Sequence, residues 1–140
     1  MTTLVDTSVW IEVFRARQPL DLEALVNFED VVTFLPVMQE VLQGFRDEAV
    51  FRRAREAMLA MPIVELPVRQ SLFLEAADLY RSARRAGITV RSSVDCLIAA
   101  AAIRYDLEVL HVDRDFEALA KVSPLRERRA VRGRRGAEGG

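Results

Sequence analysis

Five carboxylates stand where the pattern of this chain predicts the end of a strand or the start of a helix. The most unusual is Asp95, because it opens the most apolar run of the chain, which continues to Ile103. A helix that is apolar on all sides is buried, and an ionised carboxylate entering a core is costly unless it is paired or binds a metal. On this stretch alone, a simpler role is equally possible. Ser92 is a good helix N-cap, and Asp95 would then stabilise the positive end of the helix dipole.

The other four carboxylates share one position, since each follows a predicted strand directly or within a few residues. They are Asp6 after residues 3–5, Glu40 after residues 31–35, and Asp113 and Asp115 after residues 107–112. In a parallel sheet the carboxyl ends of the strands meet at one edge, so these groups can converge although they are far apart in sequence. Structural alternatives stay open at this point: an Asx turn for Asp6 and a solvated helix position for Glu40.

Converging carboxylates with no Lys or Arg among them would repel one another and shift one another's pKa strongly. A hard divalent cation removes this conflict, and Mg²⁺ and Mn²⁺ favour oxygen ligands. Two such ions would stabilise the attacking water and the leaving oxygen in phosphodiester hydrolysis. A zinc cage is excluded because the chain has one Cys and one His. We expect His111, inside an apolar run, to be structural and Cys96 to be inert.

The elements that must position these side chains alternate between helices and short strands. Strands are predicted over residues 3–5, 31–35, 63–66 and 107–112. Helical patterns cover residues 9–14 (capped by Thr7 or Ser8), 20–28, 37–43, 47–61, 68–86, 92–103 and 116–120. This alternation predicts an α/β sandwich in which helices flank a short, mainly parallel sheet.

The composition is that of one soluble domain with a sizeable core. Basic and acidic residues nearly balance, 20 against 21, which argues against a protein that coats nucleic acid. The last fifteen residues hold six Arg and two Glu, so we expect a domain over residues 1–125 and a mobile or partner-bound Arg/Gly-rich tail over residues 126–140. That tail either contacts RNA phosphates or acts as a solubilising end. The single Cys and the lack of a signal peptide or membrane-length run predict a cytoplasmic protein without a membrane segment.

Taken together, the acidic motifs resemble the PIN-domain ribonucleases, and more narrowly the VapC toxins of bacterial toxin–antitoxin pairs. The resemblance covers about residues 3–122 and is carried by residues 4–11, 39–41, 95–100 and 113–116. It implies a PIN-like three-layer α/β/α sandwich and an endoribonuclease that depends on Mg²⁺ or Mn²⁺. The catalytic acidic quartet that it implies is Asp6, Glu40, Asp95 and Asp113.

The resemblance also assigns supporting residues and partners. It implies Asp115 as a metal ligand beside Asp6, Asp95 and Asp113, and it leaves open whether Asp113 or Asp115 contacts the metal more directly. Ser8 matches a polar family position that helps to orient water. The implied partners are a VapB-type antitoxin lying across the active site, an RNA substrate (tRNA or ribosomal RNA) and a second copy in a homodimer.

Three alternatives remain. A housekeeping PIN nuclease in RNA processing would share the fold, although the short single-domain chain favours the toxin. A receiver or haloacid-dehalogenase-like phosphate protein needs a downstream Lys, and the only Lys, Lys121, lies beyond the acidic cluster. A catalytically inactive PIN binding module is disfavoured because all the acidic positions are filled.

Overall fold

A parallel sheet of four short strands forms the centre of the computed structural model, which describes residues 1–131. The strands are β1 (Thr3–Val5), β2 (Val31–Val32), β3 (Glu108–His111) and β4 (Arg126–Arg129). Their order is β2-β1-β3-β4, and every neighbouring pair is parallel. The first three strands are largely buried and apolar, as is typical of a sheet covered on both faces.

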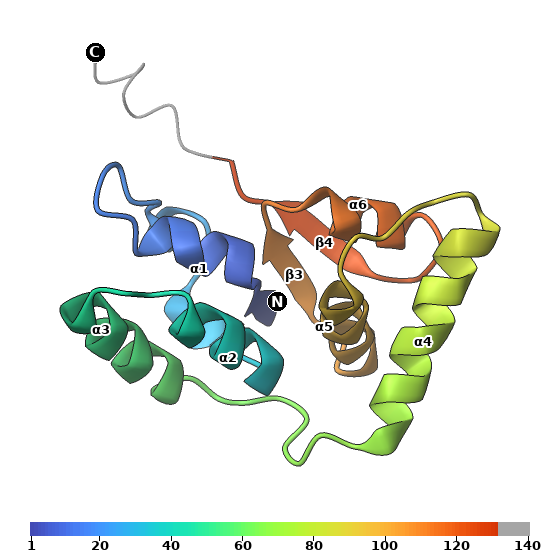
Figure 1. Ribbon diagram of the computed structural model, residues 1–140, viewed down its shortest axis with the longest axis horizontal. Coiled ribbons are helices and arrows are strands. Elements are labelled where there is room, and N and C mark those ends of the chain that lie inside the picture. Colours follow the sequence, from blue (N-terminus) through green and yellow to red (C-terminus); the bar gives the residue numbers. More distant parts are fainter. Residues whose placement is uncertain (132–140) are drawn as a thin grey trace.

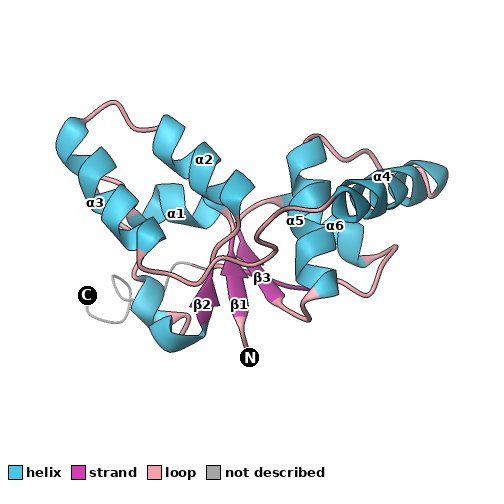
Figure 2. Ribbon diagram, turned by 90° about the horizontal axis from the view of Figure 1, so that it is seen from below, coloured by secondary structure: helices cyan, strands magenta, loops and turns pink. Residues whose placement is uncertain are grey.

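Helices flank this sheet, as the sequence predicts. In the described residues they are α1 (Thr7–Val13), α2 (Leu35–Gln43), α3 (Glu48–Leu59), α4 (Gln70–Arg85), α5 (Ser93–Arg104) and α6 (Arg114–Ala120), with 3₁₀ turns at Leu22–Ala24 and Phe28–Asp30. Figure 2 shows α1, α2 and α3 on one side of the strands and α4, α5 and α6 on the other. The predicted α/β sandwich with a parallel sheet is therefore confirmed.

The pairing register brings the carboxyl ends of three strands to the same edge. Leu4 in β1 is level with Val32 in β2 and with Val109 in β3. One step further, the Asp6 N–H donates to the Leu110 carbonyl at 2.9 Å. Residues that follow β1 and β3 therefore emerge side by side.

Helix α5 is the buried centre of the second helix group. Every residue from Asp95 to Ala102 is buried, because the helix contacts α2, α4, α6 and β3 (Figure 1). The prediction of a helix without a solvated face is confirmed. Within residues 1–131, no helix combines the length and the apolar character needed to cross a membrane.

The strand predicted over residues 31–35 is shorter than expected. Only Val31–Val32 is a strand, and Phe34 already acts as the N-cap of α2. Pro36, which is predicted to follow the end of the strand, lies in the first turn of α2 instead. Proline is tolerated there because the first helical N–H groups have no partner within the helix.

Two other predicted elements are wrong. The strand expected over residues 63–66 is reduced to an isolated parallel bridge between Ile63 and Thr33. Glu65 has a φ of 57°, a left-handed conformation that interrupts extended structure. The helical spacing of residues 20–28 corresponds to separate 3₁₀ turns. Outside α-helices and strands, Leu22, Val26 and Val64 still pack in or against the core, whereas Phe28 and Leu66 are exposed.

The expectation of a mobile segment beginning at Arg126 is wrong for its first four residues, because they form β4 on the outer side of β3. Each side chain of this strand has a partner. Arg126 pairs with Asp106, Glu127 with His111, Arg128 with Glu108, and Arg129 with Glu117. Charged side chains on an outer strand also discourage pairing with another chain. Residues 132–140, the rest of the predicted tail, lie outside the described residues.

Candidate active site

Asp6, between β1 and α1, has one carboxylate oxygen engaged and one free. It is the N-cap of α1: Oδ2 accepts hydrogen bonds from the Ser8 N–H at 3.0 Å and the Ser8 hydroxyl at 2.5 Å. The predicted cap by Thr7 or Ser8 is therefore wrong. Oδ1 is buried and has no hydrogen-bond partner in the described part of the chain. A turn-forming role explains one oxygen of Asp6 and leaves the other unexplained.

Two hydroxyl groups of the same turn connect it to neighbouring elements. The Ser8 hydroxyl accepts from the Val112 N–H at 3.1 Å, which ties the start of α1 to the end of β3. The Thr7 hydroxyl donates to Glu40 Oε1 at 2.8 Å and so orients this half-buried carboxylate of α2. Sequence reasoning missed the second contact, because no local pattern signals a hydrogen bond between residues 33 positions apart.

Three further carboxylates form a tight cluster between α5 and α6. Asp95, Asp113 and Asp115 each offer an oxygen, and these oxygens lie within 4.8 Å of one another. Asp113 is the N-cap of α6, where its Oδ1 accepts from the Asp115 N–H at 2.9 Å. Asp95 occupies the first turn of α5, and its Oδ2 is buried with no partner among residues 1–131.

Asp115 is anchored by the segment that leads into α5. Its Oδ2 accepts from the backbone N–H of Arg91 at 3.1 Å and of Ser92 at 3.2 Å. These bonds hold the start of α5 against α6 and thereby place Asp95 in the cluster. Ser92 is the N-cap residue, as predicted, but its side chain makes no capping hydrogen bond among the described residues.

The electrostatics link the carboxylates into one unit. Burial raises the pKa of Asp95 strongly, and its hydrogen bond with Asp115 and the charges of Asp6, Asp113 and Asp115 raise that pKa further. Burial also raises the pKa of Asp6, with a smaller contribution from Glu40, while hydrogen bonds from Ser8 and Thr7 oppose the shift. Burial is the larger cause of both shifts, and the contributions from neighbouring acids are the mutual repulsion expected of converging carboxylates.

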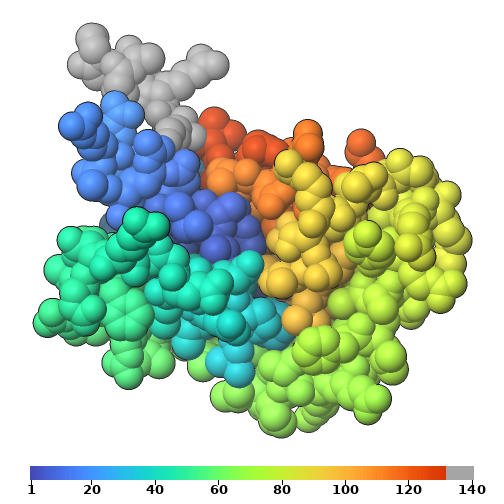
Figure 3. Space-filling view, in the orientation of Figure 1, coloured from blue at the N-terminus to red at the C-terminus, as the bar shows by residue number. Residues whose placement is uncertain are grey.

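The donor set fits a hard divalent cation. All the groups are carboxylate oxygens, and the unpartnered Asp6 Oδ1 and Asp95 Oδ2 are buried acceptors for which residues 1–131 supply no donor. Oxygen-rich, N- and S-free sites favour Mg²⁺, Mn²⁺ or Ca²⁺. In the space-filling view, the blue of β1 and α1, the cyan of α2 and the gold and orange of α5 and α6 adjoin near the middle of one face (Figure 3).

His111 and Cys96 are structural, as predicted. His111 is buried, and its Nδ1 accepts from the Asp113 N–H at 3.1 Å. The other ring nitrogen, Nε2, therefore carries the proton and donates to Glu127 at 2.8 Å. Burial, and then the charges of Asp95 and Asp115, raise the pKa of the Cys96 thiol to about 11, so the nucleophilic thiolate is not available near neutral pH.

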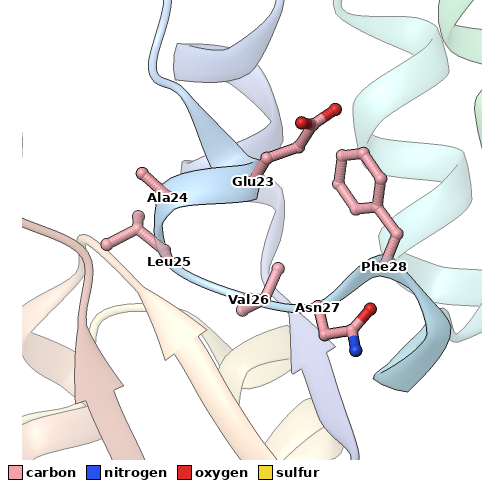
Figure 4. Close-up of a pocket in the computed structure, with 6 residues that line it drawn as sticks. All are labelled: Glu23, Ala24, Leu25, Val26, Asn27 and Phe28. Atoms are coloured by element: carbon pink, nitrogen blue, oxygen red, sulfur yellow. The ribbon is translucent and has the colours of Figure 1, made fainter.

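An open hollow of about 680 Å³ lies elsewhere, along the loop between α1 and β2 (Figure 4). Its lining runs from Glu23 to Phe28, and Glu23 is its only titratable side chain. A single exposed carboxylate beside apolar groups lacks the paired acids of the cluster. We therefore assign the chemistry to the carboxylates at the strand ends, and none to this hollow.

Comparison with known proteins identifies the family of the chain. The PIN domain family matches residues 3–122. VapC ribonuclease Mb1587 of Mycobacterium bovis is 38% identical over 128 residues, which cover 87% of this chain and 94% of the relative. Ribonuclease VapC11 of Mycobacterium tuberculosis matches with the same identity and the same coverage.

A solved structure supports the same assignment. It is VapBC-5 of Mycobacterium tuberculosis, described as a member of the VapBC family of toxin–antitoxin systems. The match has a TM-score of 0.66 and 26% identity, and it covers 92% of this chain and 98% of the matched chain. With its acidic cluster at the carboxyl edge of a parallel sheet, the chain belongs to the PIN-domain family and, within it, to the VapC ribonucleases.

Proposed function

We propose that this protein is the toxin of a VapBC-type pair and that it hydrolyses RNA phosphodiester bonds with the help of Mg²⁺ or Mn²⁺. The observation that carries the proposal is the cluster of Asp95, Asp113 and Asp115, which lies beside unpartnered buried oxygens of Asp6 and Asp95. Such a group of acids is unfavourable by itself and is suited to a divalent cation.

The residues that would hold the cation are Asp6, Asp95, Asp113 and Asp115. When bound, Mg²⁺ or Mn²⁺ supplies Lewis-acid stabilisation of the charge that develops on the phosphate during hydrolysis. Asp113 and Asp115 each have one oxygen engaged by backbone N–H groups. Among the described residues the second oxygen of Asp113 accepts no hydrogen bond, and that of Asp115 has a 4.0 Å ion pair with Arg91. Both therefore remain candidate ligands, and Ser8 supports the site by fixing Asp6.

In this proposal Glu40 accepts the proton of the attacking water. Its Oε1 is already engaged by the Thr7 hydroxyl, so the second oxygen is the one that takes the proton. The catalytic set is then Asp6, Glu40, Asp95 and Asp113. Holding each carboxylate in one orientation before the substrate arrives lowers the entropy cost of the reaction.

The proposed partners follow from the same site. An acidic site attracts a basic segment, which is the chemistry expected of a VapB-type antitoxin that covers the site. The substrate is RNA of the tRNA or ribosomal class, which places the activity in the cytoplasm. The functional toxin is a homodimer in this proposal.

The decisive experiment is RNA cleavage by the purified chain, free of any antitoxin. We expect cleavage with Mg²⁺ or Mn²⁺, none with EDTA, and a loss of more than about 100-fold in Asp95→Asn, since even residues that only support metal ligands are worth 10–100-fold. Asp78→Asn, which changes an exposed carboxylate on α4, is the matched control and should cleave normally. Cleavage that survives both EDTA and Asp95→Asn would contradict the metal–carboxylate mechanism.

Expression in cells distinguishes the toxin from a housekeeping nuclease. A toxin should arrest growth, and co-expression of its antitoxin should restore growth. Growth that is unaffected by an active enzyme would favour a role in RNA processing.

A further inference from the structure

An acidic site poses a problem for an RNA substrate. The carboxylates that attract a divalent cation repel the phosphates on either side of the bond to be cleaved, so a cation at the rim is needed to hold the strand. In the described residues, Arg91 is the one basic side chain in an ion pair with a carboxylate of the site, namely Asp115. It lies directly before the N-cap of α5, next to the cluster.

The backbone of Arg91 is fixed, whereas its side chain is held loosely. The Arg91 N–H donates to Asp115 Oδ2 at 3.1 Å. Its side-chain Nε is 4.0 Å from Asp115 Oδ1, and the side chain is 59% exposed. By comparison, Arg104 contacts Glu65 and Arg128 contacts Glu108 at 3.0 Å each. Within residues 1–131 the Arg91 guanidinium makes no hydrogen bond, so its donors are available to a ligand.

We propose that Arg91 binds a backbone phosphate of the RNA beside the acidic cluster and so positions the strand for cleavage. This inference rests on the proposed RNA cleavage. A guanidinium presents a planar fork of N–H donors that matches phosphate oxygens in a bidentate pair. The hydrogen-bonded backbone of Arg91 fixes the position from which the guanidinium extends. A phosphate can replace Asp115 as its partner because the side-chain contact with Asp115 is weak.

The test compares Arg91→Gln and Arg91→Lys with the wild type in cleavage and in RNA binding. Cleavage of a single-stranded RNA is measured with Mg²⁺, and binding of the same RNA is measured with Ca²⁺ over a range of salt concentrations. We expect Arg91→Gln to raise KM about tenfold and to change kcat less than about twofold. The reason is that the lost contact binds the substrate and the transition state equally. The salt slope of log K should fall by about 0.7, the value for one phosphate contact on a single strand.

The variants separate phosphate binding from a structural role. Arg91→Lys keeps the charge and should keep the salt slope. Arg52→Gln, an exposed arginine 3.7 Å from Glu48 on α3, should change neither KM nor the slope. An unchanged salt slope in Arg91→Gln, or a fall in kcat and in Tm with no change in slope, would overturn the inference.

If the wild type does not cleave RNA, the proposed function fails, whereas a slope change on binding would still support Arg91 as a phosphate ligand. If the wild type does not bind RNA, the inference fails as well.

Discussion

At the scale of single residues, the active-site carboxylates follow one pattern. In four of them a hydrogen bond from an N–H or hydroxyl group of the protein engages one oxygen, and no such hydrogen bond from residues 1–131 engages the other. These four are Asp6, Glu40, Asp113 and Asp115. Asp95 has no such donor, and its Oδ2 is buried without a partner among residues 1–131. The arrangement fixes the side chains at the cost of concentrated negative charge, so the cation-free protein is destabilised at its own active site.

Metal binding should therefore stabilise the folded protein. We expect Mn²⁺ or Mg²⁺ to raise the Tm of the wild type, because a ligand that binds only the folded state adds about 2.7 kcal/mol at a concentration of 100 times its Kd. EDTA should reverse the increase. Differential scanning calorimetry with and without the ion measures it.

The matched comparison uses Asp95→Asn and Asp78→Asn. Asp95→Asn replaces a buried carboxyl group whose ionisation is disfavoured by burial and by its acidic neighbours, which raise its pKa. The metal-free Tm of this variant should therefore equal or exceed that of the wild type and should not respond to metal. Asp78→Asn should respond like the wild type. If metal still raised the Tm of Asp95→Asn, the ion would bind elsewhere.

At the scale of elements, the loop between α3 and α4 depends on one buried carboxylate. Glu65 accepts hydrogen bonds from the Tyr105 hydroxyl at 2.6 Å, from the Arg69 N–H at 2.8 Å and from the Arg104 guanidinium at 3.0 Å. The bond from Tyr105, followed by those from Arg69 and Arg104, lowers the Glu65 pKa to about 2 from its usual 4.5. Glu65 thus connects the loop and the start of α4 to the end of α5.

The lowered pKa of Glu65 predicts how the stability of the folded protein depends on pH. The folded-state pKa of Glu65 lies below the unfolded value, so its stabilisation is complete above about pH 4.5 and is lost as the pH falls toward 2. We expect Glu65→Gln to lower the Tm at pH 7, and the difference from the wild type to shrink between pH 5 and about pH 2.5. The comparison is made in EDTA, so that metal binding at the active site does not contribute to the pH dependence of either protein. A difference that does not change with pH would refute the assignment.

The outer strand β4 should be required for stability. Its loss would expose the edge of β3 and remove two contacts of His111: the hydrogen bond that its Nε2 donates to Glu127, and the hydrogen bond that its carbonyl accepts from the Ala130 N–H at 2.7 Å. At about 0.5–1.5 kcal/mol for each hydrogen bond, a chain ending at Leu125 should lose at least about 5 °C in Tm. It should also aggregate more readily. A chain ending at Val131 provides the reference, and equal Tm values for the two chains would contradict the prediction.

At the scale of the whole molecule, α4 lies at one end of the protein (Figure 1), and it carries exposed apolar side chains. Phe73 is 53% exposed, and Leu74 and Tyr80 beside it are also exposed. Residues 73 and 80 are seven positions apart and share one helix face. Contiguous exposed apolar groups are typical of protein interfaces, so we assign the proposed homodimer to this face.

Substitution on α4 tests the dimer. We expect Phe73→Asp to convert the protein to a monomer in sedimentation equilibrium, because a charge cannot be buried in an apolar interface without a partner. Leu59→Asp on α3 is the matched control, since Leu59 is 54% exposed and lies in the other helix group. Dissociation by Leu59→Asp alone would move the interface to α3, and a monomeric wild type would exclude the dimer.

The features that depend on local chemistry could be predicted from the amino-acid sequence. The parallel α/β sandwich follows from the alternation of apolar runs with helical spacing, and the burial of α5 follows from the lack of a polar face after Asp95. The grouping of acidic residues at strand ends follows from the same pattern, because the ends of parallel strands share an edge. The use of these residues as metal ligands and catalysts stays a prediction.

The hydrogen bonds and ion pairs that hold the active-site side chains became apparent only in the three-dimensional structure. The donation from Thr7 to Glu40 and the anchoring of Asp115 by the amides before α5 join residues far apart in sequence. The strand β4 was missed because its residues are charged and show no apolar alternation, and ion pairs with distant carboxylates and ladder bonds with β3 hold it in place. Hydrogen bonds and ion pairs are set by geometry in three dimensions and have no period along the chain. For that reason the sequence indicated which carboxylates gather, while the fold decided which of their oxygens remain free.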